Sequence, residues 1–233
     1  MALADDLKAE VAKIFKDQWT TRDGQVVPEP EALKLSNDAV VFDAATILYA
    51  DLSGSTAMVN SENWTFAAEV YKTFLFCAAK LVREQGGTIT SYDGDRIMAV
   101  FVGNSPNTDA AKCALKINYA VSKIINPALK SQYPSSTFVV KHVVGIDTSP
   151  IRAARTGVRG GNDIVWVGRA ANYAAKLTEL NLTETSWITK DVYDKLHESA
   201  KLGGEPKRDM WKFYNWSQNG DLQIYGSNWT WAV

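Results

Sequence analysis

The sequence predicts an α+β fold, in which a split βαβ arrangement builds a mainly antiparallel sheet with helices on one face. Apolar β-type runs and helical patterns follow one another in the order strand, helix, strand, strand, helix, strand. Asp93-Gly94 separates the two middle strands, and this dipeptide is typical of a tight hairpin turn. Hydrophobic residues make up 46% of the 233 residues and charged residues 22%, which predicts a packed core rather than disorder.

The N-terminal part of the chain differs from the rest. The pattern of a short amphipathic helix covers residues 4–19, with Val11, Ile14, Phe15 and Trp19 on one side. Residues 20–43 lack periodicity and contain two prolines, so we expect a linker or an arm packed on the domain. The sequence thus divides into an N-terminal helix and arm, residues 1–43, and one domain with a C-terminal extension, residues 44–233.

The regular pattern begins at residue 44 with the strand "ATILYAD". A helix is expected over 61–85, because large apolar residues recur at helical spacing until Gly86-Gly87 ends the pattern. The next expected elements are strands over 88–92 and 95–101, a helix over 107–131 and a strand over 137–147.

The C-terminal part continues with shorter elements. A glycine- and arginine-rich turn region, "SPIRAARTGVRGG", comes first. The later elements are a strand at "DIVWV", a helix in "GRAANYAAKLTEL", a strand at "SWIT", a helical turn at "DVYDKL" and further strands in the Trp- and Tyr-rich tail, 209–233.

Composition excludes several functional classes. The net charge of −1 gives no reason to expect nucleic acid or an anionic membrane as a partner. No apolar run reaches the ~18 residues of a membrane span, and the start "MALADDLKAEV" carries acids where a secretory signal carries bases. Cys77 and Cys113 lie in helical patterns and are expected to be reduced core residues. A cytoplasmic protein is therefore expected.

Two carboxylates fall where neighbouring strands meet. Asp51 ends the first strand, and Asp95 begins the second strand of the hairpin. Because antiparallel neighbours bring a strand end beside a strand start, the two side chains are expected at one edge of the sheet. Two anions held together need a cation, and oxygen ligands suit Mg²⁺ or Mn²⁺. Taken singly, Asp51 also fits a helix cap and Asp95 a turn residue; their combination favours a metal site.

A loop suited to phosphate follows Asp51 directly. It consists of Ser53, Gly54, Ser55 and Thr56 and runs into a helical pattern. The free backbone N–H groups at a helix start attract anions, and glycine lets the backbone approach them closely. The sequence therefore predicts nucleotide phosphates next to the metal.

Three motifs in this order resemble those of the class III nucleotidyl cyclases. The matches are "YADLSGST", "YDGDRIMAVF" and "VGRAANYAAKL", and the resemblance covers about residues 44–197. It implies a ferredoxin-like palm and a head-to-tail homodimer with composite active sites. It also implies two Mn²⁺ or Mg²⁺ ions per site, held by Asp51, Asp95 and the main-chain carbonyl of Leu52. Asn172 would come from the other subunit and orient the nucleotide.

Departures from the family pattern concern the base. Ser91 stands where the family has its purine-selecting Lys, and Val165 stands where it has the purine-selecting Asp. Tyr49 replaces a Phe, and Lys176 replaces an Arg. This combination resembles the pyrimidine cyclases of the Pycsar anti-phage systems, which make cyclic UMP or cyclic CMP. The resemblance implies UTP or CTP as substrate and a separate effector protein that responds to the cyclic nucleotide.

The reaction implied is attack of the ribose 3′-OH on the α-phosphorus, with pyrophosphate leaving. Arg169, Asn172 and Lys176 share one face of the predicted helix, so they can point into one site together. Arg169 fits equally well as a solvated residue at a helix start. Two other functions stay open: an adenylate or guanylate cyclase with relocated base contacts, and an inactive cyclase-fold module that only binds nucleotides.

Overall fold

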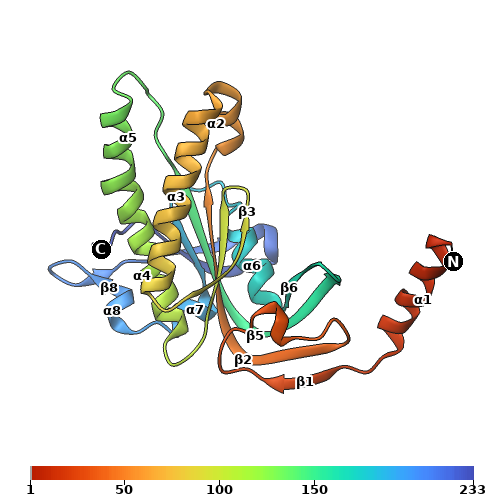
Figure 1. Ribbon diagram of the computed structural model, residues 1–233. Helices are drawn as coiled ribbons and strands as arrows, with labels where there is room; N and C mark the ends of the chain where they lie inside the picture. The colour runs from red at the N-terminus through yellow and green to blue at the C-terminus, as the bar shows by residue number, and fades with distance from the viewer. Residues whose placement is uncertain (1) are drawn as a thin grey trace.

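The structure, a computed structural model, describes residues 2–233 (Figure 1). Its main sheet has nine strands. They are β1 (Thr20–Asp23), β2 (Asp38–Leu52), β3 (Thr88–Asp93), β4 (Arg96–Phe101), β5 (His142–Val158), β6 (Gly161–Val167), β7 (Ser186–Thr189), β10 (Lys212–Trp216) and β11 (Leu222–Ser227). A separate two-stranded ribbon is formed by β8 (Leu202–Gly203) and β9 (Arg208–Asp209).

The first long strand, β2, lies in the interior of the sheet, between β5 and β4. The sheet runs β10-β11-β7-β5-β2-β4-β3, with β1 paired to β2 and β6 paired to β5. Only the β1–β2 and β5–β7 pairs of this sheet are parallel, so the α+β prediction with a mainly antiparallel sheet is confirmed. The Trp- and Tyr-rich tail supplies β10 and β11, as expected.

Eight α-helices accompany the sheet. They are α1 (Leu3–Lys16), α2 (Ser55–Ser61), α3 (Trp64–Glu84), α4 (Pro106–Tyr119), α5 (Asn126–Gln132), α6 (Arg169–Leu177), α7 (Lys190–Asp194) and α8 (Glu198–Lys201). A π-helical segment, Ala120–Ile125, joins α4 to α5. Among residues 2–233, no helix combines the length and the apolar character needed to cross a bilayer.

Helices cover both faces of the sheet, which corrects the expectation of one covered face. Leu48 and Ala50 of β2 belong to the core cluster that contains α3 and α4. Ile47 and Tyr49, which alternate with them, belong to a second cluster that contains the buried alanines of α6. Side chains on the face of Tyr49 and Asp51 therefore share their side of the sheet with α6.

The turn region expected around 149–161 is a strand instead. β5 continues to Val158 and pairs with both β2 and β6. The reason is a period-2 pattern hidden in the arginine-rich stretch: Ile151 and Ala153 are fully buried, whereas Arg152 between them is exposed. The strand expected over 137–147 accordingly starts later, at His142.

The helix expected over 61–85 is confirmed as α3, Trp64–Glu84, and a separate short helix, α2, precedes it. α3 begins with its own cap, because the Asn63 side chain accepts a hydrogen bond from the backbone N–H of Phe66 at 2.9 Å. The arm is also more regular than its sequence: β2 begins at Asp38 and runs through the position between residues 43 and 44 at which the sequence was divided.

Candidate active site

Asp51 and Asp95 lie together at one end of the sheet. Asp51 is the second-last residue of β2, and Asp95 is in the connection between β3 and β4. Ala50 of β2 pairs with Ile97 of β4, so one step further along this antiparallel ladder Asp51 is level with Arg96 and adjacent to Asp95. The central strand and the hairpin thus bring the two carboxylates to one place.

The turn that carries Asp95 differs by one residue from the sequence prediction. Asp93 pairs with Arg96, which leaves Gly94 and Asp95 as the two turn residues. Gly94 has φ +61°, the conformation that a two-residue hairpin turn requires at its first central position. Asp95 is therefore a turn residue rather than the first residue of a strand, and a sharp bend aims it at the end of β2.

The electrostatics of the pair suit a divalent cation. Burial, followed by the nearby charge of Asp95, raises the pKa of the Asp51 carboxyl to about 6, against the opposing effect of Arg96. Oδ2 of Asp95 is buried and has no hydrogen-bond partner within residues 2–233. A buried carboxylate oxygen without a donor is costly, and a cation bound there would remove the cost. The donor set, two carboxylates, fits Mg²⁺ or Mn²⁺.

A row of side chains crosses three strands beside this pair. Tyr49 of β2 is opposite Met98 of β4, and Met98 is opposite Ser91 of β3. Directly opposed residues of antiparallel strands point to the same face, so the row faces the side of Asp51. The Tyr49 hydroxyl donates a hydrogen bond to Sδ of Met98 at 3.0 Å. The sequence predicted Tyr49 and Ser91 together, and the structure adds Met98 between them.

Arg96 is a site residue that the sequence analysis missed. Its guanidinium donates to Oδ2 of Asp93 at 3.0 Å and stands 5.3 Å from the ring centroid of Tyr49. Its charge also acts on Asp51, so this cation lies among the acidic and aromatic groups of the site. The strand period offered a signal, because Arg96 is two residues before Met98 and therefore on the same face.

The loop predicted to bind phosphate, Ser53 to Thr56, joins the end of β2 to the start of α2. Gly54 adopts a left-handed conformation, φ +77°, and precedes α2. No side chain caps α2, so its first N–H groups stay available. Ser53 and Thr56 are exposed, and Ser55 is half-buried. The Leu52 side chain is buried, which ties the backbone next to Asp51 to the core.

α6 carries Asn172 and Lys176 on its outer face. Both residues are exposed, whereas Ala170, Ala171 and Ala174 are buried against the sheet. The alanines allow α6 to pack closely on the sheet. The two polar side chains therefore point away from the fold of their own chain.

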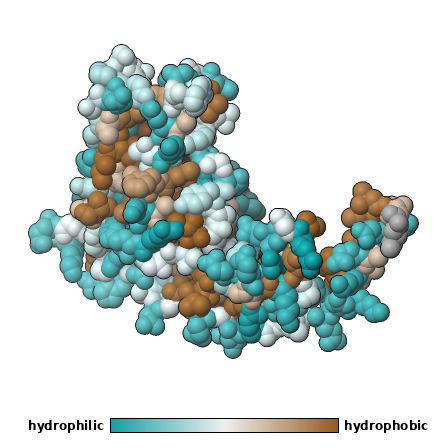
Figure 2. All heavy atoms as spheres, viewed as in Figure 1, coloured by the Kyte–Doolittle hydropathy of each residue, from teal (hydrophilic) through white to brown (hydrophobic). Residues whose placement is uncertain are grey.

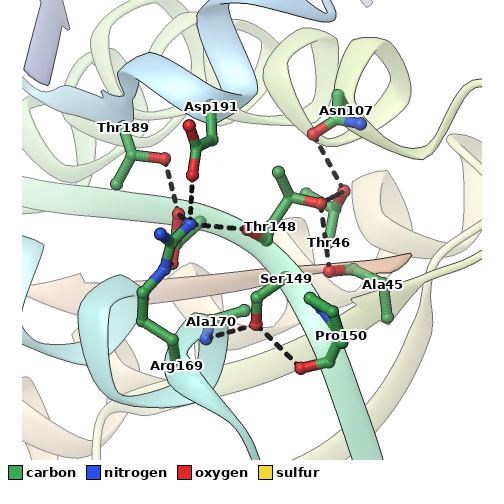
Figure 3. A network of polar contacts seen from close by, with 11 residues as sticks. Ala45, Thr46, Asn107, Thr148, Ser149, Pro150, Arg169, Ala170, Thr189 and Asp191 are labelled. Atoms are coloured by element: carbon green, nitrogen blue, oxygen red, sulfur yellow. Dashed lines mark hydrogen bonds and ion pairs between the residues drawn. The ribbon is translucent and has the colours of Figure 1, made fainter. Parts of the chain in front are cut away.

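Arg169, at the start of α6, is held by protein groups (Figure 3). Its guanidinium donates to both carboxylate oxygens of the fully buried Asp147, at 3.1 and 3.2 Å, and to the carbonyl of Thr148 at 2.9 Å. It also pairs with Asp191 of α7. These contacts use Nε and Nη2 of the guanidinium and place Arg169 in a network that joins α6 to β5 and α7.

The chain is similar over its whole length to curated bacterial proteins. It is 55% identical over 234 residues to a uridylate cyclase of Burkholderia cepacia, 48% identical over 235 residues to one of Xanthomonas perforans, and each match covers 100% of both chains. A uridylate cyclase of Rhodovulum is 36% identical over 233 residues, with 98% of this chain and 97% of the relative covered. No protein-family model matches the chain.

Solved structures show the same fold at low identity. The adenylyl cyclase CyaB of P. aeruginosa has a TM-score of 0.64 and 19% identity, and covers 81% of this chain and 95% of its own. The guanylyl cyclase Cya2 has a TM-score of 0.67 and 17% identity, with coverages of 81% and 93%. A dimeric guanylyl cyclase domain from Blastocladiella emersonii has a TM-score of 0.62 and 12% identity, with coverages of 80% and 97%. The fold is thus that of the class III nucleotidyl cyclases, and, with relatives of up to 55% identity matching it from end to end, the chain belongs to the bacterial uridylate cyclase family.

Proposed function

We propose that this protein is a pyrimidine nucleotide cyclase that converts UTP to cyclic UMP and pyrophosphate. The observation that carries the proposal is the row of Tyr49, Met98 and Ser91 beside the Asp51–Asp95 pair. Tyr49 and Met98 would lie on the side of the site that binds the base. Ser91 is too short to make the contact of the purine-selecting Lys that the family has at this position. The names of the full-length relatives support uridine over cytidine as the base.

Asp51 and Asp95 would hold Mn²⁺ or Mg²⁺, two ions per site, together with the main-chain carbonyl of Leu52. A backbone ligand fits the local composition, because residues 2–233 contain no cluster of three or more His, Cys, Asp or Glu side chains placed to hold a metal. When bound, two such ions supply the lowered pKa of a hydroxyl nucleophile and the neutralisation of triphosphate charge.

In the reaction, a bond forms between the ribose 3′-oxygen and the α-phosphorus, the bond from the α-phosphorus to the bridging oxygen breaks, and the 3′-OH proton passes to solvent. Backbone N–H groups near Ser55 and Thr56 would bind and orient the phosphates, whereas that of Ser53 donates to the carbonyl of Lys141 at 2.9 Å. Asn172 orients the ribose, and Lys176 stabilises charge as it grows on the leaving group. We expect Arg169 to hold the start of α6 in place, through Asp147 and Thr148, rather than to contact the nucleotide.

The composite site follows from where these groups lie. Asn172 and Lys176 are exposed on the outer face of α6, so they are free to meet the nucleotide held by a second copy. In the wider proposal, the cyclic UMP acts on a separate effector protein during defence against phage.

The test is incubation of the purified protein with each of the four nucleoside triphosphates and Mn²⁺, followed by identification of the product by mass. We expect cyclic UMP as the main product, and we expect no product from Asp95→Asn, which keeps the shape of the side chain but removes its charge. Cyclic AMP or cyclic GMP as the main product would favour the purine alternative. Binding of nucleotide without turnover would favour the inactive module.

A further inference from the structure

α1 carries an apolar stripe that nothing covers. Leu3, Leu7, Val11 and Ile14 are 73, 56, 50 and 51% exposed, and the helix buries no residue. Figure 2 shows these hydrophobic atoms on a helix that stands apart from the body of the molecule. A lone helix of 14 residues is only marginally stable in water, so this stripe needs a partner surface.

Hydrogen bonds hold the C-terminal end of α1 at the edge of the sheet. The side chain of Asn37, 9% exposed, donates hydrogen bonds to the carbonyls of Ile14 and Asp17 at 2.9 and 2.7 Å. The backbone N–H of Thr20 donates to the carbonyl of Asn37 at 2.9 Å. The end of α1 is thus tied to the edge of the sheet, and Figure 1 shows the helix directed outward.

The width of the stripe distinguishes between kinds of partner. Its residues recur at intervals of four, four and three, and Phe15, 87% exposed, widens it. Such a stripe, more than about 100° wide, is typical of a helix that packs on a surface. A coiled coil has a narrower stripe, in which apolar residues recur on average about every 3.5 residues.

The charges of α1 do not suit a lipid surface. Its polar side carries three acids and three lysines: Asp5, Asp6, Glu10, Lys8, Lys13 and Lys16. Helices that lie on anionic membranes are rich in Lys and Arg on this side. A protein partner therefore fits better than a membrane.

The surface of the same chain has a mainly apolar groove that could receive an apolar helix. It has a volume of about 270 Å³ and lies where β1, β2, β5 and β6 meet. The groove is lined by Trp19, Thr21, Ala39, Arg152, Ala154 and Val167. Val167 is 52% exposed, and Val165 next to it on the same face of β6 is 42% exposed. Trp19, which lines the groove, follows the end of α1 by three residues.

We propose that α1 of one copy lies in this groove of a second copy, and that the exchange is mutual. A molecule that carries both the helix and the groove can form a closed two-fold pair in which each surface is used once per subunit. Charge supports the match, because Arg152 has no ion-pair partner within residues 2–233. Asp6 and Glu10, three residues after Leu3 and Leu7, flank the stripe and would meet it.

The exchange deepens the dimer of the proposed function and rests on it. The outer face of α6 supplies the contacts that the shared site needs, whereas the helix exchange supplies affinity between the subunits. The inference therefore concerns how the pair is held together, and it can be tested without measuring catalysis.

The decisive experiment is cysteine cross-linking between two differently tagged full-length chains in a Cys77→Ser background. One chain carries Val11→Cys and the other carries Val167→Cys. We expect a disulfide between the two chains after mild oxidation, identified by peptide mass. The matched control replaces Val11→Cys by Ala9→Cys, which lies on the opposite side of α1 and should cross-link at least about tenfold less. A chain that carries both cysteines and links only within itself would overturn the proposal.

A second measurement uses the dissociation constant of the dimer from sedimentation velocity. The double variant Leu7→Asp, Val11→Asp should dissociate at least about 30-fold more readily, since two central apolar contacts are replaced by charges. The control Ala9→Asp, Ala12→Asp adds the same charge on the polar side and should dimerise like the wild type. Equal dissociation constants for both variants would contradict the exchange, as would binding of α1 to phosphatidylglycerol vesicles in place of the cross-link.

The two proposals fail in different ways. If only the helix exchange is wrong, the cross-link is absent while the protein still makes cyclic UMP. If only the cyclase proposal is wrong, the cross-link forms while no nucleoside triphosphate is converted.

Discussion

At the scale of single residues, Tyr49 is the first to test. Its ring is beside Arg96, its hydroxyl is bonded to Met98, and both contacts fix its position next to the metal-binding pair. The oxygen at its ring tip, which the family's Phe lacks, would shorten the space for a base and exclude a two-ring base by collision. Replacing Tyr49 by Ala should therefore raise kcat/KM for ATP or GTP relative to UTP by about tenfold or more.

The matched variant is Tyr49→Phe, which keeps the ring and removes only the hydroxyl and its hydrogen bond to Met98. Because the family's purine cyclases carry Phe at this position, Tyr49→Phe should move the ratio in the same direction as Tyr49→Ala if the oxygen at the ring tip excludes purines. An unchanged ratio in Tyr49→Ala, measured with all four triphosphates, would make Tyr49 a packing residue.

Arg169 is predicted to act through stability. Asp147 is fully buried, and burial is the main reason that its pKa is raised. Replacing Arg169 by Met leaves this carboxylate without its cation and should lower the free energy of unfolding by about 2 kcal/mol, a value at the low end because Arg169 is itself partly exposed. Urea unfolding measures the loss.

The double variant Asp147→Asn, Arg169→Met separates the two interpretations of Arg169. It should recover part of the stability, since no unpaired charge remains. A soluble Arg169→Met protein with wild-type stability and no activity would instead place Arg169 in contact with the nucleotide.

His142 gives the fold a pH dependence of known sign. Burial lowers the pKa of its imidazole to about 4, and within residues 2–233 its Nε2 has no hydrogen-bond partner. In the unfolded chain the group takes up a proton below about pH 6.5, whereas in the folded chain it does so only near pH 4. The folded state therefore loses about 2 kcal/mol between pH 7.5 and pH 5 through this residue.

The measurement is urea unfolding at both pH values for the wild type and His142→Leu. The difference between the two proteins isolates the histidine from the carboxylates, which titrate in both. If the variant loses as much stability on acidification as the wild type, His142 is not responsible.

At the scale of elements, the approach of α6 to β5 decides where Asn172 and Lys176 lie. A Cβ on Gly145 of β5 would be 2.2 Å from the backbone carbonyl of Ala174. Gly145→Ala should therefore push α6 away, lower stability by about 2 kcal/mol and raise KM for the nucleotide. Thermal unfolding and steady-state kinetics measure the two effects.

Gly161→Ala is the matched control. Its Cβ would meet only Cγ2 of Val158, at 3.8 Å, so both properties should stay as in the wild type. A Gly145→Ala protein with normal stability and normal KM would show that α6 can shift without consequence.

The sequence predicted most elements that have a strong local signal. The central strand, the hairpin and the tail strands follow from alternating apolar residues and turn chemistry. The long second half of β5 was missed because arginine and glycine conceal its alternation, and only pairing with β2 and β6 makes it a strand. Local pattern was not able to place α6 on the second face either, since that depends on contacts distant in sequence.

Some residues of the candidate site could be predicted from sequence motifs, and others only from the three-dimensional structure. The family motifs identified Asp51 and Asp95, and the topology brings them together. Arg96 and Met98 have no such motif, and their place follows from the register of three strands. Helical spacing predicted that Arg169 lies on the same face of α6 as Asn172 and Lys176. It was not able to predict the partner of Arg169, because Asp147 belongs to β5, which is distant in sequence.

At the scale of the whole molecule, one chain contains only part of the proposed site. Asp51 and Asp95 lie where the end of β2 meets the turn between β3 and β4, and Asn172 and Lys176 are exposed on α6. A nucleotide held by one copy would therefore be completed by α6 of the other. Mixing inactive Asp51→Ala protein with inactive Asn172→Ala protein should restore activity, because half of the mixed pairs' sites combine an intact pair with an intact Asn172.

The expected recovery has an upper limit that makes the test quantitative. With free exchange at equal concentrations, about half of the dimers are mixed and each has one intact site of two, so about a quarter of wild-type activity should return. The matched control mixes Asp51→Ala with Asp95→Ala protein, in which both changes affect the same half of the site and every site stays defective. Subunit exchange followed by mass spectrometry, together with no recovered activity in the first mixture, would show that each chain completes its own site and that the outward face of α6 serves another purpose.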